Sequence, residues 1–269
     1  MFTFATNLTF MYADSPFFER IARARASGFR YIEFHNPYPF SEDLEALAAA
    51  VNKHGVEVIH FNLPGGNWAA GDRGNASWPD RTDEFQQGVK QTIAIAQKLG
   101  CHQLNCPVGY PRPEFSLAAQ QQTLVENLRF AAGETAKAGI MLLVEPLNPI
   151  THPNYLLTTT AEAVALLERV GHPNLKIQYD YYQMQRSEGE LMETVRKTLP
   201  HIGYIQLADN PGRHEPGTGE INFRFLLNEL AGLDYHRHVG LEYTPRGRTE
   251  DSLGWIAGYG LAVDQGVAQ

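Results

Sequence analysis

The sequence predicts an α/β fold in the form of one (β/α)8 barrel. Segments typical of strands and of helices alternate strictly along the chain, eight of each, which favours a closed barrel over an open doubly wound sheet. The length of 269 residues suits one such barrel, which commonly needs about 250 residues. No GxGxxG follows the first strand, and no linker rich in Pro, Gly or Ser divides the chain. We therefore expect a single domain over residues 1–269, with a frayed tail over 261–269.

The first half of the chain contains four predicted βα units. Ser15 followed by Pro16 is typical of a helix start, and Gly28 and Gly55 are typical of helix ends. The Gly-rich stretch 64–81 is too long for a simple connector and indicates a functional loop. The predicted strands are 2–8, 31–34, 56–63 and 103–109, and the predicted helices are 17–28, 42–52, 82–99 and 116–137.

The second half repeats this pattern with more regular strands. Each strand is an apolar run followed by a polar residue and a loop, which is the layout of the active-site edge of a parallel α/β protein. The predicted strands are 141–145, 175–180, 204–209 and 239–243, and the predicted helices are 160–170, 185–199, 223–230 and 249–256.

Composition and charge exclude several classes of protein. With 43% hydrophobic and 19% charged residues, the chain resembles ordinary globular proteins. A net charge of -8 disfavours binding to nucleic acid or to anionic membranes. No apolar run reaches the roughly 20 residues that span a bilayer, and the N-terminus lacks the features of a signal peptide. Cys101 and Cys106 are then expected to be reduced thiols of a cytoplasmic protein. A homo-oligomer is compatible with the sequence.

Polar residues stand at the ends of the last four predicted strands. They are Glu145, Asp180, Gln206 and Glu242. Consecutive parallel strands are neighbours, and their C-terminal ends face one mouth of a barrel, so these side chains should converge. Carboxylates that meet in a low-dielectric site repel one another unless a cation joins them. A donor set made only of oxygens favours Mg²⁺ or Mn²⁺.

Each of these residues also has a simpler interpretation. A single acidic residue at a strand end is often a helix cap or a surface group. Four polar residues at four consecutive strand ends, each after an apolar run, favour the metal site over this interpretation.

Several longer motifs carry a family resemblance. VEPLN, IQYDxYxMQRxEGEL, IQxADNPxRxEPGTGEIN, GLEY and FNLPGGNWAAGDRG resemble the hydroxypyruvate isomerase family of the xylose isomerase-like TIM barrels, from the first predicted strand to the eighth. The resemblance implies a metal held by Glu145, Asp180, Gln206 and Glu242, with Glu145 and Glu242 as the catalytic pair that transfers protons. Members of that family usually carry a His, which contacts a substrate oxygen, where this chain has Gln183.

The resemblance implies a metal-dependent isomerase of a small hydroxy-oxo acid. Hydroxypyruvate and 2-hydroxy-3-oxopropanoate would interconvert through a cis-enediolate, which a metal and a pair of bases can support. A 2-oxo-tetronate isomerase and a ketose 3-epimerase fit the same residues. A metallonuclease and a non-catalytic sugar-acid binding barrel are alternatives from other classes. The expected partner is therefore a small hydroxy-oxo acid or a ketose.

Other polar residues are predicted to bind the substrate. Arg213 and His214, on the loop after the seventh strand, and Arg73, on the loop after the third, are suited to clamp a carboxylate, although loop arginines are often surface groups. Glu33, His35 and Asn62 are further polar residues near this mouth, and Cys106 is expected to be a core thiol. Trp68 and Trp78 would either cover the pocket or anchor their loop. The predicted substrate contacts are Arg213, His60, Gln183, Arg73, Asn105 and Trp68.

Overall fold

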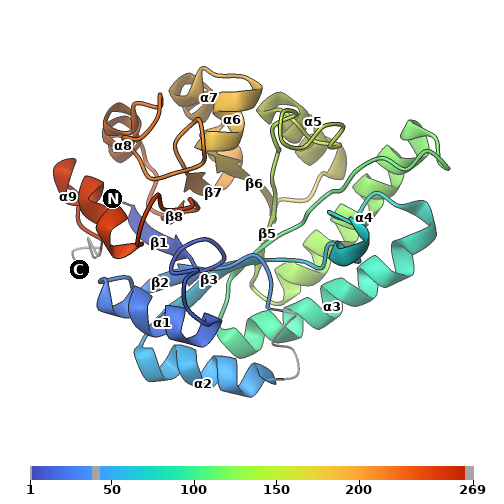
Figure 1. The fold of residues 1–269 in the computed structure, drawn as a ribbon. Coiled ribbons are helices and arrows are strands. Elements are labelled where there is room, and N and C mark those ends of the chain that lie inside the picture. Colours follow the sequence, from blue (N-terminus) through green and yellow to red (C-terminus); the bar gives the residue numbers. More distant parts are fainter. Residues whose placement is uncertain (1, 38–42, 264–269) are drawn as a thin grey trace.

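The computed structural model describes residues 2–37 and 43–263, and it confirms the predicted barrel. Strands β1 to β8 form a closed parallel barrel in sequence order, in which β1 pairs with β8, and the helices surround it (Figure 1). The strands are β1 Thr3–Asn7, β2 Tyr31–Glu33, β3 Glu57–Asn62, β4 Gln103–Asn105, β5 Met141–Val144, β6 Leu175–Asp180, β7 Ile202–Leu207 and β8 His238–Leu241.

The helices cover the outside of the barrel through apolar stripes. In α3, the buried residues Phe85, Val89, Thr92, Ala96 and Leu99 recur every three or four positions, so one face of the helix packs on the strands. The helices are α1 Phe17–Ala26, α2 Leu44–His54, α3 Thr82–Leu99, α4 Leu117–Lys137, α5 Thr160–Val170, α6 Tyr181–Ser187, α7 Leu191–Thr198, α8 Phe223–Ala231 and α9 Gly254–Gly258.

The inside of the barrel is filled by layers of side chains. Ala5, Ile59, Leu143 and Tyr204 form one buried cluster, and they come from β1, β3, β5 and β7. Four side chains from alternate strands are the usual composition of a layer in a (β/α)8 barrel. The barrel is therefore a packed core below its mouth.

Some predicted boundaries were wrong. The predicted helix 185–199 is two helices, because Gly189 and Glu190 both have left-handed φ angles, of 69° and 46°, which no helix interior can accommodate. The predicted helix 249–256 is a 3-10 turn, Glu250–Leu253, followed by α9. Ser15 does not cap α1, because Pro16 occupies the N-cap position without a side-chain cap. The fourth strand ends at Asn105 rather than at residue 109.

The long stretch 64–81 packs against the loop that follows β4. A Cβ atom on Gly74 would lie 2.3 Å from the Pro107 carbonyl oxygen, and one on Gly109 would lie 2.3 Å from the Gly74 carbonyl oxygen. Only glycines permit the two backbones to approach so closely. The two loops thus form one wall beside the barrel mouth.

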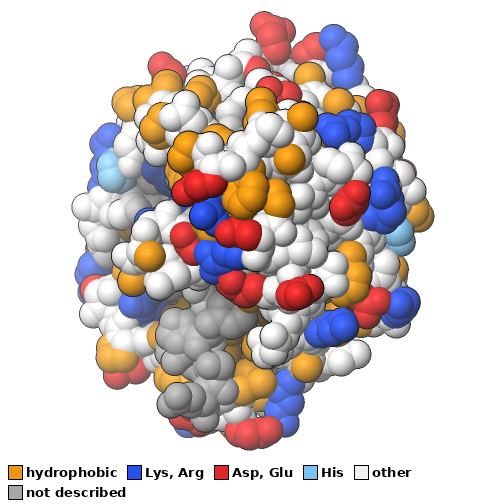
Figure 2. Space-filling model, turned by 90° about the vertical axis from the view of Figure 1, so that its right-hand side faces the viewer, with side chains coloured by type: hydrophobic (Ala, Val, Ile, Leu, Met, Phe, Trp, Pro, Cys, Tyr) orange, Lys and Arg blue, Asp and Glu red, His pale blue; other side chains and the backbone are white. Residues whose placement is uncertain are grey.

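The surface, the cysteines and the chain ends can be compared with the sequence. On the face shown in Figure 2, acidic and basic side chains are interspersed with one another. Among the residues described, no helix combines the length and apolarity needed to cross a membrane. Cys101 and Cys106 are free and buried, as expected for core thiols. Of the tail predicted to fray, residues 264–269 lie outside the described part of the chain.

Candidate active site

Three of the strand-end residues meet at the mouth of the barrel. Glu145 directly follows β5, Asp180 is the last residue of β6, and Glu242 directly follows β8. One carboxylate oxygen of each lies within 4.8 Å of those of the other two. Asp180 and Glu242 are buried, and Glu145 is half-buried. The predicted convergence of these carboxylates is therefore observed.

The carboxylates of this cluster differ in their ionisation. Burial raises the pKa of Asp180 to about 7, and the charge of Glu242 adds to this while Arg213 opposes it. Burial and the charges of Glu242 and Asp180 also raise the pKa of Glu145 well above its usual value. Burial opposes ionisation of Glu242 as well, but Arg213 and a hydrogen bond from His35 outweigh it and lower the pKa of Glu242 to about 2. Glu242 is thus the carboxylate of the cluster that ionises most readily.

The donor atoms of the cluster suit a divalent cation. Asp180 Oδ1 accepts a hydrogen bond from the Tyr182 backbone N–H at 2.8 Å, which caps α6. Asp180 Oδ2 is buried, accepts no hydrogen bond and lies 3.7 Å from Arg213 Nη2. A buried carboxylate oxygen without a donor is costly unless a cation compensates it. Glu145, Asp180 and Glu242 together offer the oxygens that hard cations prefer.

Gln206 lies beside this cluster with its amide nitrogen toward it. Its Oε1 accepts a hydrogen bond from Gln178 Nε2 at 2.5 Å. Its Nε2 donates to Glu33 Oε1 at 2.8 Å and to Glu242 Oε1 at 3.3 Å. For Gln206 to act as the predicted oxygen ligand, its amide must rotate by about 180° so that Oε1 faces the carboxylates. This rotation exchanges the oxygen and the nitrogen with little change in shape.

Arg213 occupies the space directly above the carboxylates. Its Nη2 donates to Glu242 Oε2, and its guanidinium lies over the rings of Phe10 and Tyr182, 5.0 Å and 5.3 Å from their centroids. Arg213 itself has a left-handed φ of 58°. The loop after β7 thus places the positively charged guanidinium of Arg213 at the site, and the two rings fix its position. His214, in the same loop, instead pairs its Nδ1 with the Thr244 carbonyl oxygen at 2.7 Å.

A cavity of about 150 Å³ opens above the carboxylates. Its volume is below the range of roughly 300–1,000 Å³ typical of drug-sized ligands, which suits a substrate of few atoms. Glu145 and Glu242 line it. Five predicted substrate-binding residues line it as well, namely Arg213, Gln183, Arg73, Asn105 and Trp68.

His60 does not line this cavity. It is buried in the barrel, where its ring stacks on Tyr204 with 5.1 Å between centroids. Burial lowers the pKa of His60 to about 4, so the imidazole is neutral. His60 therefore lies in the interior of the barrel and not on the surface that a substrate would reach.

Glu33 is the centre of a buried polar network under the carboxylates. It accepts hydrogen bonds from Asn7 Nδ2 at 2.9 Å and from Tyr204 Oη at 2.5 Å, besides the bond from Gln206. Burial and the charge of Glu242 raise the pKa of Glu33 to about 8. A Cβ atom on Gly240 would lie 2.6 Å from Tyr204 Oη, so only glycine leaves room for this network.

The two tryptophans of the long loop have different roles. Trp68 is 42% exposed and forms part of the cavity wall, where the Arg73 guanidinium lies 4.5 Å from its ring centroid. Trp78 is buried, and its Nε1 donates to the Tyr110 carbonyl oxygen at 2.9 Å. Trp78 is therefore the anchor of the loop, and Trp68 is the residue at the cavity.

Some residues of the site were not predicted. His152 and Tyr155, on the loop after β5, line the cavity. Asn148 on the same loop donates to Gln183 Oε1 from its backbone N–H at 3.1 Å and from its Nδ2 at 2.5 Å. The one available signal was their place on the loop that follows Glu145, since the loops after barrel strands form the active-site face.

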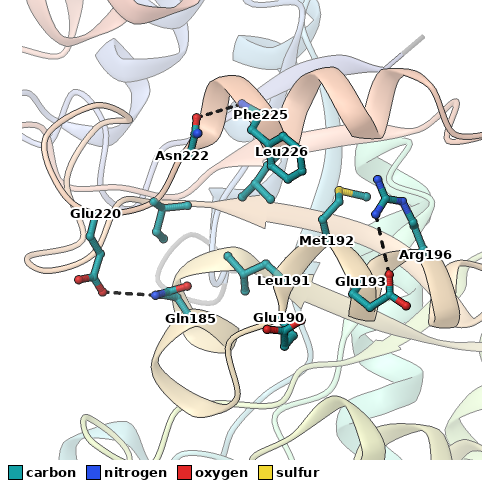
Figure 3. Close-up of a pocket in the computed structure, with 11 residues that line it drawn as sticks. Gln185, Glu190, Leu191, Met192, Glu193, Arg196, Glu220, Asn222, Phe225 and Leu226 are labelled. Carbon is teal, nitrogen blue, oxygen red and sulfur yellow. Dashed lines mark hydrogen bonds and ion pairs between the residues drawn. The ribbon is translucent and has the colours of Figure 1, made fainter.

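A second groove lies on the outer surface between α7 and α8 (Figure 3). Leu191, Met192 and Leu226 form its apolar part, and Gln185 donates to Glu220 at 3.3 Å across its edge. None of the four strand-end residues lines it, so it is separate from the cavity at the barrel mouth.

Comparisons with known proteins agree with this architecture. A family model described as a xylose isomerase-like TIM barrel matches residues 21–259. The hydroxypyruvate isomerase of Escherichia coli (strain K12) is 44% identical over 259 residues, which cover 96% of this chain and 100% of that protein. The 2-oxo-tetronate isomerase of Pectobacterium atrosepticum is 36% identical over 252 residues, which cover 94% of this chain and 95% of that protein.

A solved structure from Brucella melitensis, described as an AP endonuclease of family 2, is also similar. It has a TM-score of 0.92 and 39% identity, and the match covers 96% of this chain and 99% of that one. The family model, the relatives and the shared fold extend over nearly the whole chain. This chain therefore belongs to the xylose isomerase-like TIM barrel family, in which it is a ketol isomerase related to the hydroxypyruvate isomerases.

Proposed function

We propose that this chain is a metal-dependent isomerase that interconverts hydroxypyruvate and 2-hydroxy-3-oxopropanoate. The observation that carries the proposal is the cluster of Glu145, Asp180 and Glu242 at a cavity of about 150 Å³ that Arg213 also lines. A relative named hydroxypyruvate isomerase, after this reaction, supports the proposal. The two free, buried cysteines support a reducing compartment such as the cytoplasm.

The metal in this proposal is Mg²⁺ or Mn²⁺. Glu145, Asp180 and Glu242 would hold it, with Gln206 as a fourth ligand after its amide has turned. Oxygen ligands favour these hard ions over Zn²⁺. When bound, the cation would offset the repulsion among the carboxylates and polarise the carbonyl and hydroxyl oxygens of the substrate.

Two carboxylates at the cavity are suited to move the protons. Glu242, which lines the cavity, is the base that takes a proton from C3 of hydroxypyruvate. Glu145, which also lines it, returns a proton to C2 of the enediolate. The hydroxyl proton passes from O3 to O2, so the atoms balance. Two positioned carboxylates are suited to act as general base and general acid.

Arg213 is the group that distinguishes an acid from a neutral sugar. Its guanidinium reaches the cavity while Phe10 and Tyr182 hold it, and a guanidinium can bind a carboxylate through two parallel hydrogen bonds. Arg73 lines the same cavity from the opposite loop and adds positive charge. An acidic protein that binds an anion needs such local compensation.

The test follows the exchange of carbon-bound protons with solvent. The wild-type protein with Mg²⁺ or Mn²⁺ is incubated with hydroxypyruvate in D2O, and deuterium incorporation is measured by NMR. We expect incorporation at C2 of the product by the wild type, none by Glu242→Gln, and wild-type behaviour by Glu168→Gln, which alters an exposed carboxylate of α5. Absence of exchange in the wild type, or exchange that persists in Glu242→Gln, would contradict the proposal.

Alternative functions predict other outcomes of the same experiment. A 2-oxo-tetronate isomerase, the activity named for a relative, would exchange protons of the four-carbon acid faster than those of hydroxypyruvate. A ketose 3-epimerase would exchange the C3 proton of a neutral ketose, and a non-catalytic binding barrel would exchange none. A metallonuclease would need histidines, but the metal-compatible cluster found among the described residues contains only carboxylates.

A further inference from the structure

The side chain of Gln183 is engaged by a neighbouring loop. Gln183 is buried at the cavity, and its Oε1 accepts both hydrogen bonds from Asn148. With two donors at 3.1 Å and 2.5 Å, this oxygen is already satisfied. Gln183 is therefore held in place by Asn148.

Asn148 organises the turn that follows it. Its Oδ1 accepts from the backbone N–H groups of Ile150 at 3.2 Å and Thr151 at 2.9 Å. Its carbonyl oxygen accepts from the His152 N–H at 3.0 Å. Side chains of Asn commonly stabilise turns in this way. The bond to Gln183 thus ties the whole turn 148–152 to α6.

This turn places an imidazole at the cavity. His152 lines it together with Gln183, Arg73 and Arg213. Its Nδ1 pairs with Tyr110 Oη at 3.1 Å, which fixes the ring. In the described part of the chain, Nε2 of His152 has no hydrogen-bond partner, although charged side chains of Arg and Glu line the same cavity. When one nitrogen of a His ring is held by a hydrogen bond, the orientation of the ring is fixed. The other nitrogen, unpaired at a cavity, is then suited to bind a ligand.

We propose that His152 contacts a substrate oxygen through Nε2, and that Gln183 and Tyr110 are positioning residues for it. This inference rests on the proposed function for the identity of the substrate. In the tautomer in which Tyr110 Oη donates to Nδ1, Nε2 carries the proton and donates to a carbonyl or hydroxyl oxygen of a hydroxy-oxo compound.

The charge state of His152 agrees with this role. Burial and the nearby charges of Arg213 and Arg73 lower the pKa of His152. A neutral ring can carry its proton on Nε2 while Nδ1 accepts from Tyr110. The contact is then a hydrogen bond that orients the substrate, whereas the two arginines bind its negative charge.

The first measurement is ligand binding, which does not depend on turnover. The imidazole nitrogens of the ¹⁵N-histidine-labelled wild-type protein are observed by NMR with Mg²⁺, and the His152 signals are assigned with His152→Gln. Hydroxypyruvate, a 2-oxo-tetronate and dihydroxyacetone are then added in turn. We expect the Nε2 signal of His152 to shift with at least one of them. If no compound moves it, the contact does not exist, whether or not the wild type isomerises hydroxypyruvate.

The second measurement is kinetic. With the best substrate of the wild type, we expect His152→Gln to lower kcat/KM at least about 10-fold while Mg²⁺ affinity is retained. His102→Gln, which changes an exposed histidine, should behave as the wild type. Unchanged kinetics in His152→Gln would overturn the proposal.

Positioning by Gln183 and Tyr110 has its own readout. We expect Gln183→Ala and Tyr110→Phe to shift the His152 signals in the ligand-free protein and to raise KM more than they lower kcat. Tyr110→Phe keeps the ring packing, so it remains informative if Gln183→Ala fails to fold. Ligand-free His152 signals that stay at the wild-type position in Tyr110→Phe would contradict the positioning role.

Discussion

Replacement of Arg213 by alanine should weaken the use of acids more than that of neutral sugars. The guanidinium lies against Glu242, is held between Phe10 and Tyr182, and reaches the cavity. A hydrogen bond to a charged group contributes about 1.5–3 kcal/mol. Its loss in Arg213→Ala corresponds to about a 10- to 150-fold lower kcat/KM for hydroxypyruvate. Arg213→Lys keeps the positive charge but lacks the paired N–H donors of the guanidinium, so the decrease in kcat/KM should be intermediate.

The matched neutral substrate is dihydroxyacetone, which has a CH2OH group in place of the carboxylate of hydroxypyruvate. The assay compares kcat/KM for both compounds in the wild type, Arg213→Ala, Arg213→Lys and the exposed control Arg169→Ala. We expect the ratio of the two values to change only in the Arg213 variants. An equal loss for both compounds would refute the carboxylate clamp and would favour the epimerase alternative.

The same variant has a second consequence, for pH dependence. Arg213 is the strongest influence that lowers the pKa of Glu242, so its removal should raise that pKa. The ionised base would then be lost at a higher pH as the solution is acidified. We expect the acid limb of the kcat/KM profile to move to higher pH in Arg213→Ala and to stay in place in Arg169→Ala.

Four further substitutions have distinct expected outcomes. Asp180→Asn keeps an oxygen to cap α6 but removes a charge, so Mg²⁺ affinity by calorimetry should fall while the melting temperature of the metal-free protein does not decrease. The pKa of Glu33 is raised to about 8, so between about pH 4.5 and 8 the folded state binds more protons than the unfolded state. The free energy of unfolding should therefore fall as pH rises toward 8. For one group the fall is at most about 1.4 kcal/mol per pH unit. Denaturation at several pH values should show a flatter dependence for Glu33→Gln, and an equal slope would contradict this assignment. Trp68→Ala should raise KM with little loss of stability. Trp78→Ala removes a buried anchor and should lower the free energy of unfolding by about 3–5 kcal/mol. A large loss of stability in Trp68→Ala would show that the Trp68 ring is structural.

The sequence by itself determined the barrel and the convergence of its carboxylates. Both follow from local patterns, because alternating strands and helices leave few topologies and the carboxyl ends of parallel strands share one edge. Glu145, Asp180 and Glu242 could therefore be brought together without coordinates. Helix breaks were harder to predict, since Glu190, in a left-handed conformation, belongs to a residue type that usually continues a helix.

Only the tertiary structure decided how the side chains around the carboxylates are used. The orientation of the Gln206 amide depends on Gln178 and on Glu33, which is 173 residues away. His60 lies inside the barrel because Tyr204 stacks on it. His152 reaches the cavity through a turn that Gln183 ties to α6. These arrangements are set by hydrogen bonds between strands and loops that are distant in sequence, and no local pattern of residues records which partner each polar side chain will find.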